Sequence, residues 1–307
     1  MSDQVGAAVA ADVGRRSGRR GARARLRPLE PYLLMAPAVL FLLVFLGWPI
    51  LGALGVAFQT AAGQWTLANV QRLVHDTDFG LAVRNTLLLL VVIIPLELAV
   101  ALAMAALAQT RLRGRGLFLY AWSFPLAISD LAAGLVWLAI FTQHGYLNSL
   151  LQDLRVVPHP IGFLNYDNLP GLVVAVVVAE TWRSISLVMV VVMSGIQSIP
   201  AELGEAAAVM GAGAWRRFRH VTLPLLKPTI QVALILRTTA AFQVFAVVLA
   251  LTGSGLPVLA TKTESWAYDA RNYQMAAVYA VLLLAFSSLG TLLYLTGLRT
   301  PRQVFQR

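Results

Sequence analysis

Residues Glu205 to Pro228 read EAAAVMGAGAWRRFRHVTLPLLKP and form a polar, arginine-rich stretch between two long apolar runs. The preceding Pro200 suits the first turn of a helix, and the acidic and alanine residues after it favour a short helix as far as Met210. Gly211 and Gly213 are expected to end that helix, and the prolines near the end of the stretch interrupt the second one. The sequence therefore predicts two short helices joined by a bend.

The composition around this stretch is typical of a membrane protein. Hydrophobic residues make up 58% of the 307 and charged residues only 12%, with a mean hydropathy of +0.72; soluble chains carry about 25% charged residues. Six apolar runs reach the length of about 20 residues that a membrane-spanning helix needs. They lie at residues 33–58, 81–108, 117–141, 171–197, 229–251 and 275–298. We therefore expect an all-α membrane protein with six transmembrane helices within residues 31–300.

The net charge of +10 follows the pattern of the connections between these runs. Most lysines and arginines fall in alternate connections, at Arg15–Arg27, Arg111–Arg115, Arg216–Lys227 and Arg299–Arg307. The positive-inside rule places such connections in the cytoplasm. We expect residues 1–30 to be a disordered, arginine-rich cytoplasmic tail, residues 198–228 to be a cytoplasmic loop and residues 301–307 to be a second cytoplasmic tail. The charge is thus a topology signal, and we expect no nucleic acid partner.

Motifs of enzymes and metal sites are missing from the sequence. Cysteine is absent, which excludes disulfides, thiolate metal ligands and a cysteine nucleophile. The sequence has no phosphate-binding Gly-x-x-x-x-Gly-Lys-Ser/Thr motif, so the chain alone is not expected to hydrolyse ATP. Its four histidines lack metal-ligand spacing, and no Gly-x-Ser-x-Gly elbow occurs. We predict no catalytic residue and no metal site.

The order of residues in the polar stretch resembles the EAA loop of the inner-membrane permeases of binding-protein-dependent ABC importers. The matching positions are Glu205, Ala206, Ala207, Gly211, Ala212, Phe218, Leu223, Pro224 and Pro228. One position departs from the family pattern, because Met210 stands where the family usually has Asp. That departure removes whatever polar contact the Asp would make.

Further motifs make the chain similar to carbohydrate-type permeases of the maltose kind, over roughly residues 30 to 298. They are Arg84-Asn85-Thr86, Glu180-x-Trp182, Ile199-Pro200 and Leu251-Thr252-Gly253. The resemblance implies a type I ABC importer permease with cytoplasmic coupling helices between transmembrane helices 4 and 5. It implies that Glu205, Ala206, Ala207, Met210, Gly211, Ala212, Phe218, Leu223 and Pro224 couple the chain to an ATPase.

Partners and location also follow from the resemblance. It implies a second permease subunit, two ATPase subunits that bind ATP and Mg, and an extracytoplasmic solute-binding protein. This chain itself would hold no cofactor. It would lie in the lipid of a bacterial inner membrane, with both termini in the cytoplasm.

Charged residues within the apolar runs are few, because each costs roughly 2.5 to 3.5 kcal/mol to insert into a membrane. Apart from Arg84, where the second run begins, they are Glu97, Asp130, Glu180, Arg183 and Arg237. Glu180 and Arg183 are three residues apart and share a helical face. They form either a structural ion pair or part of the substrate path.

Two other groups are candidates for the substrate path. Asp130 follows a proline and precedes Trp137 by two turns, a combination that suits a sugar, although such a tryptophan also serves in packing. Arg237, Phe242 and Gln243 recur near one side of the fifth run, where the resemblance places part of the path. Helix packing is the alternative explanation for this second group.

The resemblance implies import of a sugar or sugar-like solute. A glycerol phosphodiester, a polyol or a peptide are alternatives within the same family. A secondary transporter would need no ATPase, but it is expected to show an internal repeat, and we find no convincing one. A membrane-embedded enzyme has no candidate catalytic cluster.

Overall fold

The computed structural model of the protein describes residues 30–108 and 114–297. Helices make up most of these residues, and the one strand-like contact among them is an isolated antiparallel bridge between Gln59 and Trp65. The all-helical expectation is therefore confirmed for the described part of the chain. The two expected tails, residues 1–30 and 301–307, lie outside the described residues except for Glu30.

Two compact units divide the chain, residues 1–55 and 56–307. The first contains helix α2 (Glu30–Leu42), the π-turn η1 (Leu43–Gly47) and most of helix α3 (Trp48–Ala57). The candidate span Tyr32–Ala57 has a mean hydropathy of 2.4, and its most apolar window has no buried residue. A helix that is apolar on all sides is typical of a membrane span. This helix corresponds to the expected span at residues 33–58.

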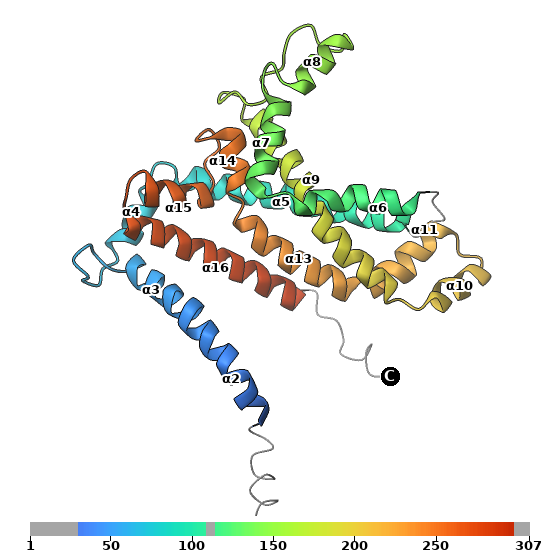
Figure 1. The fold of residues 1–307 in the computed structure, drawn as a ribbon, viewed down its shortest axis with the longest axis horizontal. Helices are drawn as coiled ribbons and strands as arrows, with labels where there is room; N and C mark the ends of the chain where they lie inside the picture. The colour runs from blue at the N-terminus through green and yellow to red at the C-terminus, as the bar shows by residue number, and fades with distance from the viewer. Residues whose placement is uncertain (1–29, 109–113, 298–307) are drawn as a thin grey trace, which may run out of the picture. The chain divides into compact units, whose positions relative to one another are not determined.

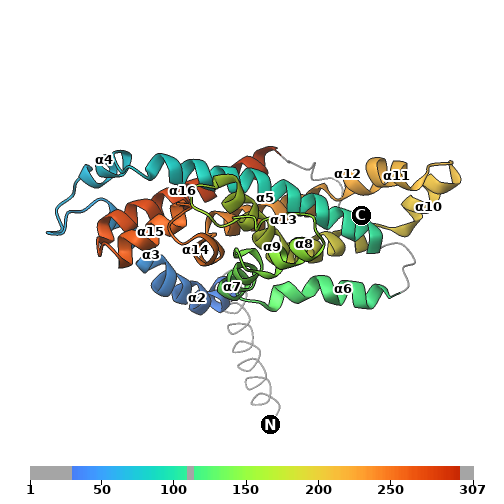
Figure 2. The same ribbon diagram turned by 90° about the horizontal axis from the view of Figure 1, so that it is seen from above.

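Three long helices in the second unit are also long and apolar enough to cross a membrane. They are α5 (Phe79–Ala108), α9 (Leu169–Gln197) and α16 (Tyr273–Gly297). They correspond to the expected spans at residues 81–108, 171–197 and 275–298. Helix α9 packs along α5, and α13 (Lys227–Phe242) contacts both α9 and α16 (Figure 1; Figure 2).

The expected span at residues 117–141 is sharply bent rather than straight. It consists of α6 (Arg115–Ser123), the 3₁₀ turn η2 (Phe124–Ala127) and α7 (Asp130–Phe141), and α8 (Tyr146–Asp153) follows. The angle at the break is 107°. Pro125 lies in the 3₁₀ turn, and Ser129 then caps a new helix by accepting a hydrogen bond of 3.3 Å from the backbone N–H of Ala132. The local sequence thus starts a separate helix in the middle of the span.

The expected span at residues 229–251 is bent as well. Helix α13 ends at Phe242, and α14 (Ala246–Thr252) continues at an angle of 48°. No glycine or proline lies between the two helices, so the sequence contains no local signal for this bend. By length and composition, the described residues provide four spans, or up to six if each bent pair counts as one.

Helix α9 carries many of the buried residues of the second unit. Ala175, Val176 and Ala179 are fully buried and belong to one apolar cluster with Ile93 of α5 and Val248 of α14. Their small or branched side chains let the neighbouring backbones approach closely. Helix α9 is therefore packed closely against both α5 and α14.

The remaining helices lie toward the two ends of the second unit. Helices α4 (Ala68–Val74) and α15 (Leu259–Tyr268) lie at one end (Figure 1; Figure 2). The opposite end carries α10 (Ala201–Val209), α11 (Ala214–Arg217), the π-turn η3 (Phe218–Thr222) and the short helix α12 (Leu223–Leu225).

Candidate functional site

The stretch that resembles an EAA loop forms the predicted pair of short helices. Helix α10 ends at Val209, and Gly211 then adopts a φ of +80°. The N–H of Gly211 donates to the carbonyl of Ala208, and the N–H of Ala212 donates to that of Ala207, both at 2.9 Å. These two bonds close a Schellman motif, which needs a left-handed residue at its turn. Gly211 therefore sets the bend between the two helices.

The outer surface of this loop is apolar in part. Val209 is 89% exposed and Met210 is 88% exposed at the end of α10. The loop therefore places two apolar side chains at its outer surface, next to the glycine turn. Among the predicted coupling residues, those exposed are Glu205, Ala206, Met210, Gly211 and Pro224, and those half-buried are Ala207, Ala212, Phe218 and Leu223.

The second short helix widens into a π-turn before a proline. Pro224 has no N–H to donate to the carbonyl of His220, and His220 lies inside the π-turn η3. Trp215 and Phe218 stack on this segment, with ring centroids 5.8 Å apart and planes at 26°. The proline effect that we expected from the sequence therefore takes the form of a wider turn within a continuous helical segment.

A second candidate site lies within the long helices, where charged groups meet. Arg237 on α13 donates from Nε to Oε2 of Glu97 on α5 at 2.5 Å, and from Nη2 to Oε1 of Glu180 on α9 at 2.7 Å. All three side chains are at most 2% exposed. One guanidinium thus joins two carboxylates from different helices.

The network continues from Glu180 toward the surface. Arg183 donates from Nη2 to Oε1 of Glu180 at 2.9 Å and forms an ion pair from Nη1 to Oδ1 of Asp130 at 2.8 Å. Ser184 also donates to Oε1 of Glu180, at 3.1 Å. The Arg183 side chain is 20% exposed and that of Asp130 is 55% exposed. The ion network, defined as Glu97, Arg237, Glu180, Arg183 and Asp130, therefore runs from a buried end to an exposed one.

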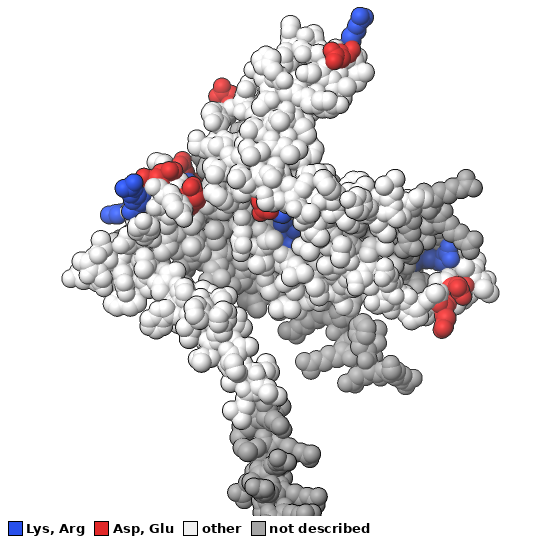
Figure 3. Space-filling view, in the orientation of Figure 1, with Lys and Arg blue, Asp and Glu red and all other residues white. Residues whose placement is uncertain are grey.

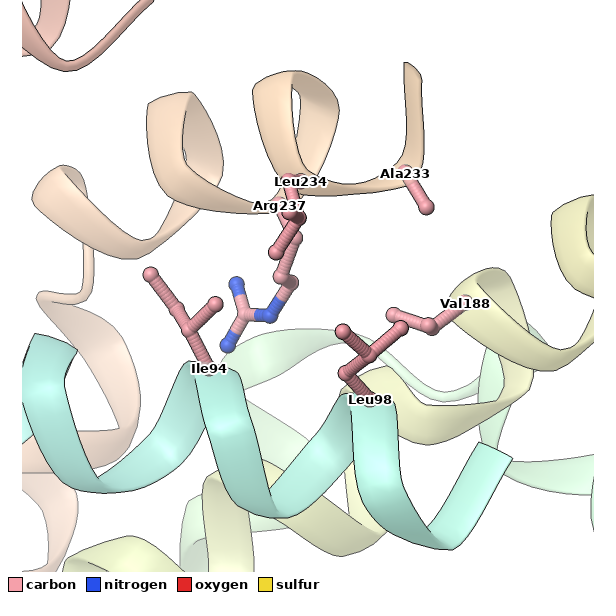
Figure 4. A pocket seen from close by; sticks show the side chains of 6 residues that line it. All are labelled: Ile94, Leu98, Val188, Ala233, Leu234 and Arg237. Atoms are coloured by element: carbon pink, nitrogen blue, oxygen red, sulfur yellow. The ribbon is translucent and has the colours of Figure 1, made fainter. Parts of the chain in front are cut away.

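Arg237 is surrounded by apolar side chains at the buried end of the ion network. Figure 4 shows it reaching from α13 toward α5, with Ile94 and Leu98 of α5 and Val188 of α9 around it. The pocket that these residues line has no room for a water molecule. Each buried charge depends on its protein partners, because water cannot replace them.

The predicted pair of Glu180 and Arg183 is present, but it belongs to a larger assembly. Arg237 joins it, although the sequence places Arg237 near one side of the fifth run with Phe242 and Gln243. The sequence did not place Glu97 among the candidate path residues. The one signal for Glu97 was that it is an acidic residue within an apolar run. The partner of that residue, Arg237, lies 140 positions away.

The other candidate path residues are not members of the ion network. Phe242 is buried and stacks on Phe286, with centroids 6.1 Å apart and planes at 8°, while Gln243 is exposed at the end of α13. Trp137 stacks on Phe141 at 5.3 Å and meets Trp182 edge-on at 5.9 Å. These contacts are those of packed aromatic side chains.

A polar cluster at the end of the unit that carries α15 was not foreseen from the sequence. Oδ2 of Asp76 accepts hydrogen bonds from Tyr279 Oη at 2.8 Å and from Trp266 Nε1 at 3.0 Å. Lys262 Nζ lies 3.8 Å from the same oxygen. Burial raises the pKa of the Asp76 carboxyl, but the backbone N–H of Asp78, these two donors and Lys262 lower it more, so the net pKa lies below its ordinary value of 3.8.

The described residues contain no group of three or more His, Cys, Asp or Glu side chains that could hold a metal ion. The ion network has a different character, because each of its carboxylates is paired with an arginine.

Known proteins resemble the chain along most of its length. Residues 6–296 match the family described as "Binding-protein-dependent transport system inner membrane component". The sn-glycerol-3-phosphate transport system permease protein UgpA of Brucella abortus is 34% identical and aligns with 76% of this chain and 80% of its own length. The lactose transport system permease protein LacF of Rhizobium radiobacter is 31% identical, over 80% of this chain and 84% of its own length.

A third relative is matched over a shorter part. The trehalose/maltose transport system permease protein MalF of Thermococcus litoralis is 32% identical over 56% of this chain, and the match spans 58% of that relative's length. Among solved structures, a chain of a bacterial alginate ABC transporter, crystallised with a periplasmic protein bound to alginate pentasaccharide, superposes with a TM-score of 0.76 at 21% identity. That match covers 89% of this chain and 95% of the other, and it shows a shared fold. The chain therefore belongs to the family of binding-protein-dependent transport system inner membrane components.

Proposed function

We propose that this chain is the membrane-spanning permease subunit of an ABC importer for a sugar or sugar-like solute. The observation that carries the proposal is the α10 to α12 segment, which presents exposed Val209 and Met210 beside the Gly211 turn at one end of the spans. Family membership supports the same conclusion. The permease would work with a second permease subunit and with two ATPase subunits that bind ATP and Mg. It would not itself be an enzyme or hold a cofactor.

Helix α10 would be the coupling element. Its apolar tip fits a cleft on an ATPase subunit, and the exposed carboxylate of Glu205 is available to a basic side chain there. In this arrangement the loop and both chain termini are cytoplasmic, as the positive-inside rule predicts. Because Met210 replaces the family Asp, this interface would rely on apolar contact at that position.

The exposed end of the ion network supports a solute path. Asp130 and Arg183 are partly exposed on helices whose other surfaces are largely apolar. Figure 3 shows one small patch of opposite charges near the middle of the face, away from the charged groups at its ends. A charged pair is costly next to lipid tails, so it favours a surface that faces water or a partner subunit. A solute hydroxyl can donate to Asp130 and accept from Arg183.

Buried members of the ion network have a different proposed role. Glu97, Glu180 and Arg237 are too enclosed to touch a solute and would position Arg183. Trp137, Phe242 and Gln243 have less support as path residues, because the first two are held in aromatic packing and the third does not belong to the ion network.

The solute class rests on the relatives. Their names specify trehalose and maltose, lactose and sn-glycerol-3-phosphate, and the superposed structure belongs to an alginate transporter. A sugar is therefore the first candidate, and a glycerol phosphate ester is the second, because the name of UgpA specifies sn-glycerol-3-phosphate. The names of these relatives specify neither a free polyol nor a peptide. An extracytoplasmic binding protein would deliver the solute.

The test is solute-stimulated ATP hydrolysis in liposomes. The chain would be purified with its co-expressed neighbouring permease, ATPase and binding protein. The binding protein would be screened against disaccharides, polyols and glycerol phosphate esters. The proposal expects a sugar to bind and to raise ATP hydrolysis several-fold above the rate without solute. Assembly of this chain without any ATPase, or uptake driven by an ion gradient alone, would show that it is not an ABC permease.

A further inference from the structure

An apolar groove of about 540 Å³ lies between α5 and the start of the second short helix. Its lining includes Ala99, Leu102, Ala103 and Ala106 on α5, and Ala214, Trp215 and Phe218 opposite them. The groove exists because alanines recur on one side of α5, so that small side chains face two large rings. Its volume falls within the range of about 300 to 1,000 Å³ that is usual for ligand sites.

The lining of this groove suits hydrocarbon. The lining side chains contain no hydrogen-bonding group except the indole N–H of Trp215, so water gains few partners there. The groove is open along one side and lies beside the last turns of α5, which ends at Ala108. An acyl chain lying along α5 would fill it.

The position of Trp215 indicates a membrane boundary. This side chain is 71% exposed and stacks on Phe218. Tryptophan is enriched at the level of lipid head groups, because its ring is apolar and its N–H is polar. With Trp215 at that level, the groove would begin at the head groups and continue toward the acyl chains.

Basic residues adjoin the groove residues Trp215 and Phe218 along the chain. Arg217 and Arg219 are the sequence neighbours of the groove residue Phe218, and Arg216 precedes them. No acidic residue occurs between Glu205 and Glu264, so these arginines have no acidic neighbour along the loop. Among the described residues no ion pair involves any of the three. Basic side chains beside an apolar groove attract an anionic head group.

We propose that this groove binds an anionic phospholipid, with one acyl chain against Ala103 and Ala106 and the phosphate beside Arg217 and Arg219. The lipid is distinct from the transported solute. Since the groove joins α5 to the proposed coupling segment, a bound lipid would brace Trp215 and Phe218 against the span.

The test measures lipid contact with Trp215 directly. The full-length chain, purified in the complex in which it occurs, is placed in nanodiscs with phosphatidylcholine and increasing fractions of brominated phosphatidylglycerol. Bromine quenches nearby tryptophan fluorescence, and the difference between the wild type and Trp215→Phe isolates the Trp215 signal. We expect half-maximal quenching at a several-fold lower mole fraction of brominated phosphatidylglycerol than of brominated phosphatidylcholine.

Two variants separate the head group from the acyl chain. The double substitution Arg217→Gln with Arg219→Gln should remove the preference for phosphatidylglycerol, whereas Arg155→Gln, on a distant loop, should leave it unchanged. Ala103→Leu should fill the groove and reduce quenching by both lipids. Size-exclusion chromatography checks that each variant still assembles.

Three outcomes would overturn the proposal. Equal quenching by the two lipids would mean that the arginines select no head group. Preference retained in the double arginine variant would place the lipid elsewhere. Absence of quenching by either lipid would mean that a protein surface, such as the second permease, covers the groove. None of these measurements depends on uptake, so the lipid proposal can fail or hold independently of the proposed transport function.

Discussion

Arg237 and Glu97 are 140 positions apart in the chain, yet Nε of Arg237 lies 2.5 Å from Oε2 of Glu97. Both side chains are buried, and Nη2 of the same guanidinium pairs with Oε1 of Glu180. The contact ties α5, α9 and α13 together at one point. The balance of charges in the ion network determines how each substitution there should change stability.

The first prediction concerns Arg237→Met. This change leaves Glu97 and Glu180 buried with only Arg183 nearby, so one buried carboxylate loses its partner. We expect a loss of about 3–5 kcal/mol in stability and poor assembly. Glu97→Gln should cost less, because Arg237 keeps Glu180 and the amide oxygen still accepts its Nε–H. Thermal unfolding in detergent would rank the two variants, and a larger loss for Glu97→Gln would contradict this charge balance.

The second prediction concerns Asp130→Asn. Without Asp130, two carboxylates and two guanidiniums remain in the ion network and their charges cancel. Because the pair with Arg183 is partly exposed, we expect a stability change of no more than about 1 kcal/mol. Uptake should nevertheless fall at least several-fold if the pair faces the solute. Normal uptake by a fully assembled Asp130→Asn complex would remove this residue from the path.

A third prediction separates Glu180 from the path. Glu180 accepts hydrogen bonds from Arg183, Ser184 and Arg237. Glu180→Gln should therefore lower the amount of assembled complex, and the complexes that still assemble should transport normally. A double variant with Arg183→Gln should recover part of the loss, because it removes the arginine left with fewer partners. The measurement is the amount of intact complex in membranes. Full assembly with lost transport would instead indicate direct contact with the solute.

The fourth prediction concerns Gly211→Leu. A leucine at a φ of +80° is strained by roughly 1–2 kcal/mol. The turn after α10 should therefore shift, and uptake should fall while ATP hydrolysis continues. Gly213→Leu is the matched control, since Gly213 has a φ of −63° and open space around it. Uptake per ATP hydrolysed would test the prediction, and equal effects of the two substitutions would contradict it.

The fifth prediction concerns Asp76→Asn. A carboxyl whose pKa is lowered in the folded state stabilises it fully above its unfolded pKa near 3.8, and this contribution falls as the pH drops through the lower folded pKa. We expect Asp76→Asn to lose about 1–3 kcal/mol at pH 7. The difference from the wild type should shrink below about pH 4. Thermal unfolding at pH 7 and near pH 3 would measure it.

Asp78→Asn provides the control for that experiment. Asp78 is about half exposed and pairs with Lys262 at 3.0 Å. An exposed ion pair contributes about 0–1 kcal/mol. A loss at Asp78 as large as that at Asp76 would mean that the charge of Lys262, rather than the buried hydrogen bonds, accounts for the effect.

Local features of this protein could be predicted from its sequence. The bend at Gly211 depends on one backbone conformation, and the pairing of Glu180 with Arg183 depends on helical spacing of three residues. The straight spans follow from hydropathy and length, which need no knowledge of neighbours. Pro224 indicated an irregular helix, but the sequence did not indicate that the irregularity would be a π-turn.

Contacts between distant segments depended on the tertiary structure. The sequence marked Glu97 and Arg237 only as costly charges within apolar runs, and nothing in their spacing indicated that they meet. The bend after Phe242 has no glycine or proline to announce it. Turns and helical faces follow from interactions within a few residues, whereas partners across the bundle depend on how whole helices pack. Sequence alone therefore determined the four unbent candidate spans and the glycine turn between α10 and α11, and only helix packing decided which buried charges neutralise one another.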